Sequence, residues 1–92
     1  MNPTEIKTAE NHCLKTESPY FIMVMKGDKT FEVRKNDRNF KVGQSITLME
    51  TMLGEYTGRE LAPKEISYIL HGGQFGIQEG YCVLGLKLDS KQ

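Results

Sequence analysis

Short runs in which apolar and polar residues alternate, each ended by glycine or by a cluster of turn residues, fill most of this chain. Alternation with a period of two is typical of half-buried strands. The runs with strand character are 12–15, 31–34, 40–42, 45–49, 56–57, 64–70 and 81–88. The last run is apolar enough to be a central strand. The pattern predicts a mainly β (α+β) fold, a small closed or nearly closed barrel of five to six strands.

One segment departs from this pattern at residues 18–27. Ser18 offers a hydroxyl N-cap, and Pro19 stands at the first helical position, where its missing N–H costs nothing. Apolar residues then recur at helical spacing up to Met25, and Gly27 supplies a C-terminal stop. We expect one N-terminal helix of about two turns, short enough to depend on tertiary packing for its stability.

The chain has 92 residues, which is enough for one domain and one modest core. Twelve basic and twelve acidic residues give a formal net charge of zero, which excludes a histone-like protein and an acidic disordered tail. The longest apolar run, 20–25, is too short to span a bilayer, and no apolar segment follows Met1. We expect a cytoplasmic protein with a flexible arm at 1–10 and a single domain at 11–92.

Cysteine usage agrees with a reducing compartment. Cys13 and Cys82 are far apart in sequence and belong to no Cys-x-x-Cys motif, so two free thiols are favoured over a single disulfide. A zinc site built from these cysteines with His12 and His71 would need His12 and Cys13 to bind one ion. Adjacent side chains on a strand point to opposite faces, which opposes that geometry. We expect no metal and no cofactor.

The first candidate site lies in residues 27–34. Alternation divides this strand into a polar and an apolar face: Thr30, Glu32 and Arg34 on the first, Phe31 and Val33 on the second. Lys29, at the turn before the strand, is placed to lean over the polar face. Two cations and one carboxylate would bind an anionic or polar ligand, with Glu32 orienting Arg34. The alternative is a solvated strand face that carries a surface ion pair.

Two neighbouring features bear on the same question. Residues 26–41 hold six basic and three acidic side chains, a local charge of +3 that would suit a phosphate backbone but does not by itself indicate duplex DNA. Residues 71–80 form a loop with four glycines in which His71, Gln74 and Phe75 offer an imidazole, an amide and a stacking ring. Amide contacts and aromatic stacking are how single-stranded RNA is commonly recognised. The alternative is a hairpin connection whose Phe75 tucks into the core.

Together these stretches resemble a known family. They are His12-Cys13-Leu14-Lys15, Pro19-Tyr20-Phe21, residues 27–38, Phe40-Lys41-Val42-Gly43-Gln44, Tyr56-Thr57-Gly58-Arg59 and residues 69–81. The chain resembles, over roughly residues 11–88, short bacterial and phage proteins in the ASCH branch of the PUA-like superfamily. The hallmark Gly-x-Lys-x-x-Glu-x-Arg matches Gly27, Lys29, Glu32 and Arg34.

The resemblance implies a PUA-like pseudo-barrel and RNA or a modified nucleoside as the ligand class. Our leading hypothesis is an RNA- or nucleotide-binding module without enzymatic activity, its cleft formed by the hallmark element and the glycine-rich loop. The candidate ligand-binding residues are Lys29, Glu32, Arg34, Arg38, His71, Gln74 and Phe75. Some ASCH relatives resemble amidohydrolases of acetylated cytidine, so a hydrolase with Lys29 and Glu32 as its acid–base pair is one alternative. Their nucleophile position holds Glu32 here in place of a hydroxyl. A protein-interaction accessory factor is a second alternative.

Overall fold

The structure, a computed structural model, describes residues 10–88 and contains six strands and one helix. The elements are β1 (Asn11–Glu17), α1 (Ser18–Lys26), β2 (Phe31–Lys35), β3 (Ser45–Met52), β4 (Glu55–Glu60), β5 (Lys64–His71) and β6 (Tyr81–Leu86). The mainly β fold with one short helix is confirmed. Residues 1–9 of the expected arm lie outside the described residues.

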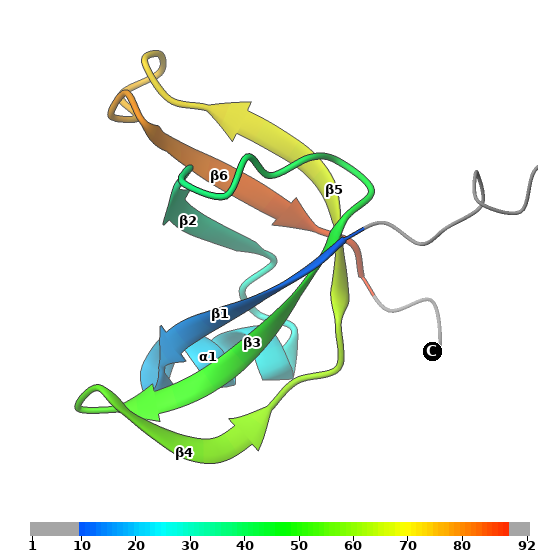
Figure 1. Cartoon of the computed structure of the whole chain (residues 1–92), viewed down its shortest axis with the longest axis vertical. Coiled ribbons are helices and arrows are strands. Elements are labelled where there is room, and N and C mark those ends of the chain that lie inside the picture. The colour runs from blue at the N-terminus through cyan, green and yellow to red at the C-terminus, as the bar shows by residue number, and fades with distance from the viewer. Residues whose placement is uncertain (1–9, 89–92) are drawn as a thin grey trace, which may run out of the picture.

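The strands form one strongly curved sheet in the order β1-β3-β5-β6-β2, with β4 added beside β3 (Figure 1). The β1–β3 pair is parallel and every other pair is antiparallel. The start of β5 pairs with β3, and the remainder pairs with β6 after a register shift between Ile66 and Tyr68. This irregularity lets β5 turn from one half of the sheet to the other, which gives the pseudo-barrel shape.

The core fills the concave side of the sheet. Its fully buried side chains are Phe21, Ile46, Leu48, Ile66, Cys82 and Leu84. β6 lies between β5 and β2, as its apolar sequence predicts. No helix within residues 10–88 is long and apolar enough to cross a bilayer.

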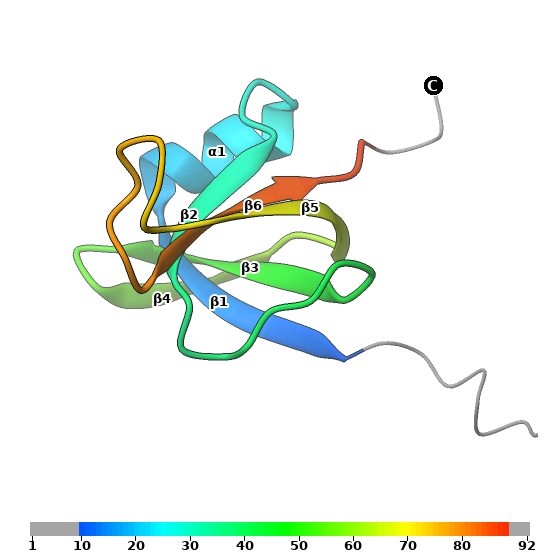
Figure 2. The same cartoon turned by 90° about the horizontal axis from the view of Figure 1, so that it is seen from above.

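Helix α1 leads directly from the end of β1 toward β2 (Figure 2). Gly27 ends it as expected, with a left-handed backbone (φ 87°) and an N–H that donates to the Val24 carbonyl. The predicted N-cap is wrong. Glu17 holds that position without a side-chain cap, because the extended backbone of β1 runs straight into the helix. The Ser18 hydroxyl instead donates to Glu50 Oε2 at 2.8 Å.

Two strand predictions are also wrong in detail. Residues 40–42 form no strand: Phe40 drops into the core, and its N–H donates to Asn36 Oδ1 at 3.3 Å. In β5 the bulge breaks the expected alternation, so Ile66 and Ile69 point inward while Tyr68 is exposed. A regular period of two cannot anticipate a bulge, which inserts an extra residue into one strand of a pair.

Neighbours His12 and Cys13 point to opposite sides of β1. His12 is buried, its Nε2 lies 2.9 Å from Gln44 Oε1, and its ring meets the Phe40 ring edge-on at 4.8 Å. Cys13 is exposed and Cys82 is buried, and both are free thiols. These contacts within the described residues are sufficient to explain the burial of His12.

Candidate ligand-binding site

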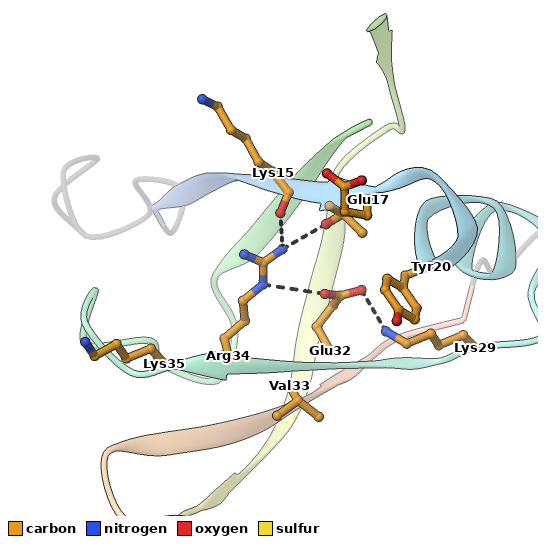
Figure 3. Close-up of a pocket in the computed structure, with 9 residues that line it drawn as sticks. Lys15, Glu17, Tyr20, Lys29, Glu32, Val33, Arg34 and Lys35 are labelled. Atoms are coloured by element: carbon orange, nitrogen blue, oxygen red, sulfur yellow. Dashed lines mark hydrogen bonds and ion pairs between the residues drawn. The ribbon is translucent and has the colours of Figure 1, made fainter. Parts of the chain in front are cut away.

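A cavity of about 470 Å³ opens between β1 and β2. These are the two edges of the curved sheet, and no strand pairing joins them within the described residues. The lining residues come from β1, the first turn of α1, the connection between α1 and β2, and β2 (Figure 3): Lys15, Thr16, Glu17, Tyr20, Lys29, Glu32, Val33, Arg34 and Lys35. The volume lies in the range of small-molecule binding sites.

Glu32 is the buried centre of this cavity, with a side chain only 5% exposed. The polar face expected for β2 therefore exists, but at Glu32 it is not the solvated surface of the alternative interpretation. The apolar residues of the strand are the exposed ones, Phe31 at 43% and Val33 at 53%. An isolated buried carboxylate is costly, so Glu32 needs the cations beside it.

Lys29 supplies the shorter of the two ion pairs. It follows the turn made by Gly27, and its Nζ lies 2.9 Å from Glu32 Oε2. The same ammonium group donates to the Phe31 carbonyl at 2.7 Å. It also lies 4.9 Å from the Phe31 ring centroid and 5.9 Å from that of Tyr20. All these contacts suit a positively charged donor.

Arg34 joins the two open edges of the sheet. Its Nη2 donates to the Lys15 carbonyl at 2.7 Å and to Thr16 Oγ1 at 2.8 Å, both on β1. Its Nε lies 3.5 Å from Glu32 Oε1 but makes no hydrogen bond within the described part of the chain, although the atom is buried. A buried donor without a partner is unusual and costs free energy. The cavity wall therefore contains an ion pair whose donor and acceptor atoms face each other without forming a hydrogen bond.

The cavity carries a net positive charge. Four cations and two carboxylates line it, a balance of +2. Glu17 is committed elsewhere: its carboxylate accepts from Thr51 Oγ1 at 2.6 Å and from the backbone N–H groups of Leu53 and Gly54. These hydrogen bonds, that from Thr51 above all, lower the pKa of Glu17 despite its desolvation. A ligand with one or two negative charges would complement the +2 balance of the cavity lining.

The other predicted site residues lie outside this cavity. Arg38 also reaches β1, where its Nη1 donates to the Cys13 carbonyl at 3.1 Å. His71 ends β5, and Gln74 and Phe75 belong to the loop between β5 and β6, which projects beyond these strands (Figure 2). None of these four lines the cavity or a smaller one of about 270 Å³ beside the end of α1. The structure unites Lys29, Glu32 and Arg34, and it does not bring the glycine-rich loop into their cavity.

The glycine-rich loop has a defined conformation of its own. Gln74 pairs with Ile77 around a tight turn in which Phe75 adopts a left-handed φ of 51° and is exposed. The Gln74 side chain donates to the His71 carbonyl at 2.9 Å. The loop is a hairpin connection between the antiparallel strands β5 and β6, as the alternative held, but its Phe75 does not tuck into the core.

Sequence reasoning missed two groups of residues. Lys15, Thr16 and Tyr20 line the cavity only because β1 and α1 face β2 across the open seam, and no local pattern signals that proximity. The second omission is Glu50, an acidic residue within the largely buried strand β3, and that position is itself a detectable signal.

Glu50 is a structural brace outside the cavity. It accepts from Arg59 Nε and Nη2, both at 3.2 Å, and from the hydroxyls of Thr57 and Ser18, both at 2.8 Å. These bonds, with Arg59 contributing most, lower the pKa of Glu50 from 4.5 to about 2. They connect α1, β3 and β4.

Two comparisons with known proteins bear on the family to which this chain belongs. Residues 11–86 match the family described as "Domain of unknown function (DUF3850)". The chain is also 40% identical over 53 residues to an "Uncharacterized 12.9 kDa protein in GpA 3'region" of Escherichia phage P2, a match that covers 58% of this chain. It spans about half the length (49%) of that phage relative. Because the family match covers nearly all the described strands, the chain belongs to the DUF3850 family.

Proposed function

We propose that this protein binds RNA or a nucleotide, modified or not, in the cavity between β1 and β2. The observation that carries the proposal is the ion pair of Arg34 Nε and Glu32 Oε1 in the cavity wall, which are 3.5 Å apart and make no hydrogen bond to each other. A ligand edge with an acceptor beside a donor would satisfy both atoms once the Arg34 side chain turns its buried Nε toward the cavity. Nucleobases carry such pairs on their Watson–Crick edges, the edges by which proteins commonly recognise unpaired bases.

An uncharged amide would also offer an acceptor beside a donor, but two further features of the cavity favour a nucleotide. The Tyr20 ring lines the cavity and is 57% exposed, so it offers a stacking surface for a base. Lys15 and Lys35 line the same cavity and would neutralise a phosphate group. A base held by Glu32 and a phosphate held by these lysines would together match the positive balance of the lining.

The proposal includes a place for the family within the ASCH branch of the PUA-like superfamily. Its support is the hallmark spacing of Gly27, Lys29, Glu32 and Arg34, three of which line the cavity. The glycine-rich loop would then contact a longer RNA outside the cavity. A cytoplasmic location belongs to the same proposal and suits the exposed free thiol of Cys13.

The hydrolase alternative receives no support from a specific contact. A general base must accept a proton, whereas the Lys29 ammonium group donates to Glu32 and to the Phe31 carbonyl. We therefore propose binding without turnover, including no hydrolysis of N4-acetylcytidine.

The test is an NMR titration of the ¹⁵N-labelled protein with nucleosides, nucleoside 5′-monophosphates and short single-stranded RNAs. We expect shifts centred on β2 and the first turn of α1, and weaker binding as salt rises. Tyr20→Ala should weaken binding about tenfold, a typical loss for one stacked base. Tyr56→Ala, at an exposed tyrosine of β4 away from the cavity, is the matched control. Salt-independent shifts, or equal affinities for both variants and the parent, would refute the proposal.

A further inference from the structure

The convex side of strands β5, β6 and β2 carries an apolar surface that faces away from Glu32 and Arg34, and Val33 and Lys35 on this side also border the cavity. We call this surface the outer face. Strand register places its members directly opposite one another: Val33, Val83 and Leu70 in one row, Phe31, Gly85 and Tyr68 in the next. Tyr81 stands opposite Lys35 at one end. The three strands run side by side in the upper half of Figure 1.

The composition of this face is unusual for a sheet exposed to water. Solvent-facing positions of a half-buried strand are normally polar, as they are on β1, where Asn11, Cys13, Lys15 and Glu17 are exposed. On β2 the apolar side chains face solvent because Glu32 and Arg34 point inward. Tyr68, on the bulged strand β5, is 64% exposed. Clustered exposed apolar residues mark interaction sites more often than scattered ones.

Gly85, in the centre of the face, separates Phe31 from Tyr68 and leaves the space between them open. Its backbone does not require glycine, since it lacks the left-handed φ of the loop glycines. An added Cβ would lie in ordinary contact, 3.4 Å from Ser67 Oγ and 3.5 Å from the Tyr68 carbonyl oxygen. The chain's own fold would therefore accept a methyl group there. Glycine inside a strand often marks a place where another chain approaches closely.

We propose that the outer face binds the outer face of a second copy of this chain. A two-fold axis along β6 would lay Phe31 on the partner's Tyr68 and Val33 on the partner's Leu70. The two Gly85 residues would then meet at the axis and leave room for the aromatic rings. This arrangement is self-complementary, as a two-fold dimer requires, and it is the aligned packing of two sheets.

Charge favours a second copy over a nucleic acid. Lys35 stands at the end of the paired rows and the Lys29 ammonium group lies 4.9 Å from the Phe31 ring centroid, so cations border the outer face but no charged residue lies in its two central rows. A single-stranded nucleic acid requires a positively charged groove beside its stacking rings. Two copies of a chain whose formal net charge is zero meet without repulsion.

The exposed area sets the strength of the dimer. With ~200 Å² for a whole aromatic residue, exposures of 43% and 64% leave about 200 Å² open on Phe31 and Tyr68 together. The remaining apolar members bring each face to roughly 400 Å², half of the ~800 Å² that a standard interface takes from each partner. We therefore expect a weak dimer, with a Kd on the order of 100 µM.

Sedimentation velocity from about 10 µM to about 1 mM tests the proposal. The average mass should rise from monomer toward dimer across this range. Tyr68→Lys should raise the Kd at least ~10-fold, because it places two like charges in an apolar interface. Gly85→Val should do the same by filling the central gap. Val42→Lys, at an exposed apolar residue outside the face, should dimerise like the parent. Melting curves confirm that each variant is folded.

A monomer at every concentration, or unchanged dimerisation of folded Tyr68→Lys, would overturn the proposal. NMR titration with a short single-stranded oligonucleotide adds a further outcome. Shifts at Tyr68 and Val83 in a protein that stays monomeric would make the face a nucleic-acid platform and reject the dimer. The dimer and the nucleotide site are tested separately. Tyr20→Ala tests nucleotide binding in the cavity, whereas Tyr68→Lys and Gly85→Val test dimerisation through the outer face.

Discussion

Replacing Arg34 with alanine removes the side chain that connects the two open edges of the sheet. Its guanidinium group makes hydrogen bonds of 2.7 and 2.8 Å to β1 and is 23% exposed. A hydrogen bond from a charged group contributes about 1.5–3 kcal/mol. The freed Lys15 carbonyl and Thr16 hydroxyl can bond to water instead, so the lower end applies to each bond. We expect Arg34→Ala to lower the free energy of unfolding by about 3 kcal/mol.

A loss of that size is easily measured in a domain of this length. Each kcal/mol shifts the melting temperature of a 60–100-residue domain by about 4–8 °C, so Tm should fall by roughly 12–24 °C. Urea denaturation gives the free energy directly. Amide hydrogen exchange should also accelerate along β1, since local opening of that edge becomes easier.

Two control variants show whether Arg34 stabilises the fold through its hydrogen bonds to β1 or only through its positive charge. Arg34→Lys keeps a cation beside Glu32 but lacks the planar fork that reaches two acceptors, so its loss should be intermediate. Arg38→Ala removes one exposed hydrogen bond, 3.1 Å to the Cys13 carbonyl, and should cost less than about 1 kcal/mol. If Arg34→Ala melts within about 3 °C of the parent and exchanges β1 amides at the same rate, the guanidinium group does not hold the seam.

Three further predictions concern other parts of the fold. Because the pKa of Glu50 is lowered to about 2, its contribution to stability is complete above pH 4.5 and is lost as pH falls toward 2; Glu50→Gln should flatten this acid limb of the Tm profile. Gly72→Ala would place a Cβ 2.0 Å from the Gln78 carbonyl oxygen, so it should destabilise the protein by about 1–3 kcal/mol, whereas Gly85→Ala should be tolerated in thermal melts. Cys13 should react rapidly with a thiol reagent and Cys82 slowly, because burial shields the Cys82 thiol and raises its pKa.

Local signals were sufficient to predict where most elements lie. Gly27 ends the helix because the chain adopts a left-handed backbone conformation there, and glycine adopts that conformation without steric cost. The division of β2 into two faces follows from strand geometry, which any extended segment obeys. The grouping of Lys29, Glu32 and Arg34 was predicted for the same reason, since all three lie within six residues of one another.

Contacts between distant segments decided what local signals could not. Ser18 lies within the helix and not at its N-cap because β1 runs directly into α1, and its hydroxyl donates to Glu50, 32 positions away. The bulge in β5 arises where that strand leaves β3 for β6, a choice of partners that its own sequence does not record. The residue types of the loop that holds Phe75 led us to assign it to the ligand-binding cleft. Its actual position, at the far end of the β5–β6 pair, depends on the length and direction of these two strands.

The orientation of β2 links the two proposed surfaces. Shifting this strand by one residue would exchange its faces, burying Phe31 and Val33 and exposing Glu32. The observed register leaves about 160 Å² of those two apolar residues in water, which forgoes about 4 kcal/mol of burial at 25 cal/mol per Å². Backbone hydrogen bonds from Asn36 to Gly80 and from Leu86 to Thr30 hold this register at both ends of the strand. The same register supplies a buried carboxylate to the cavity and an apolar surface to the opposite side. A ligand would bond to the polar groups of the cavity, and a second copy would cover Phe31 and Val33, which folding alone leaves in contact with water.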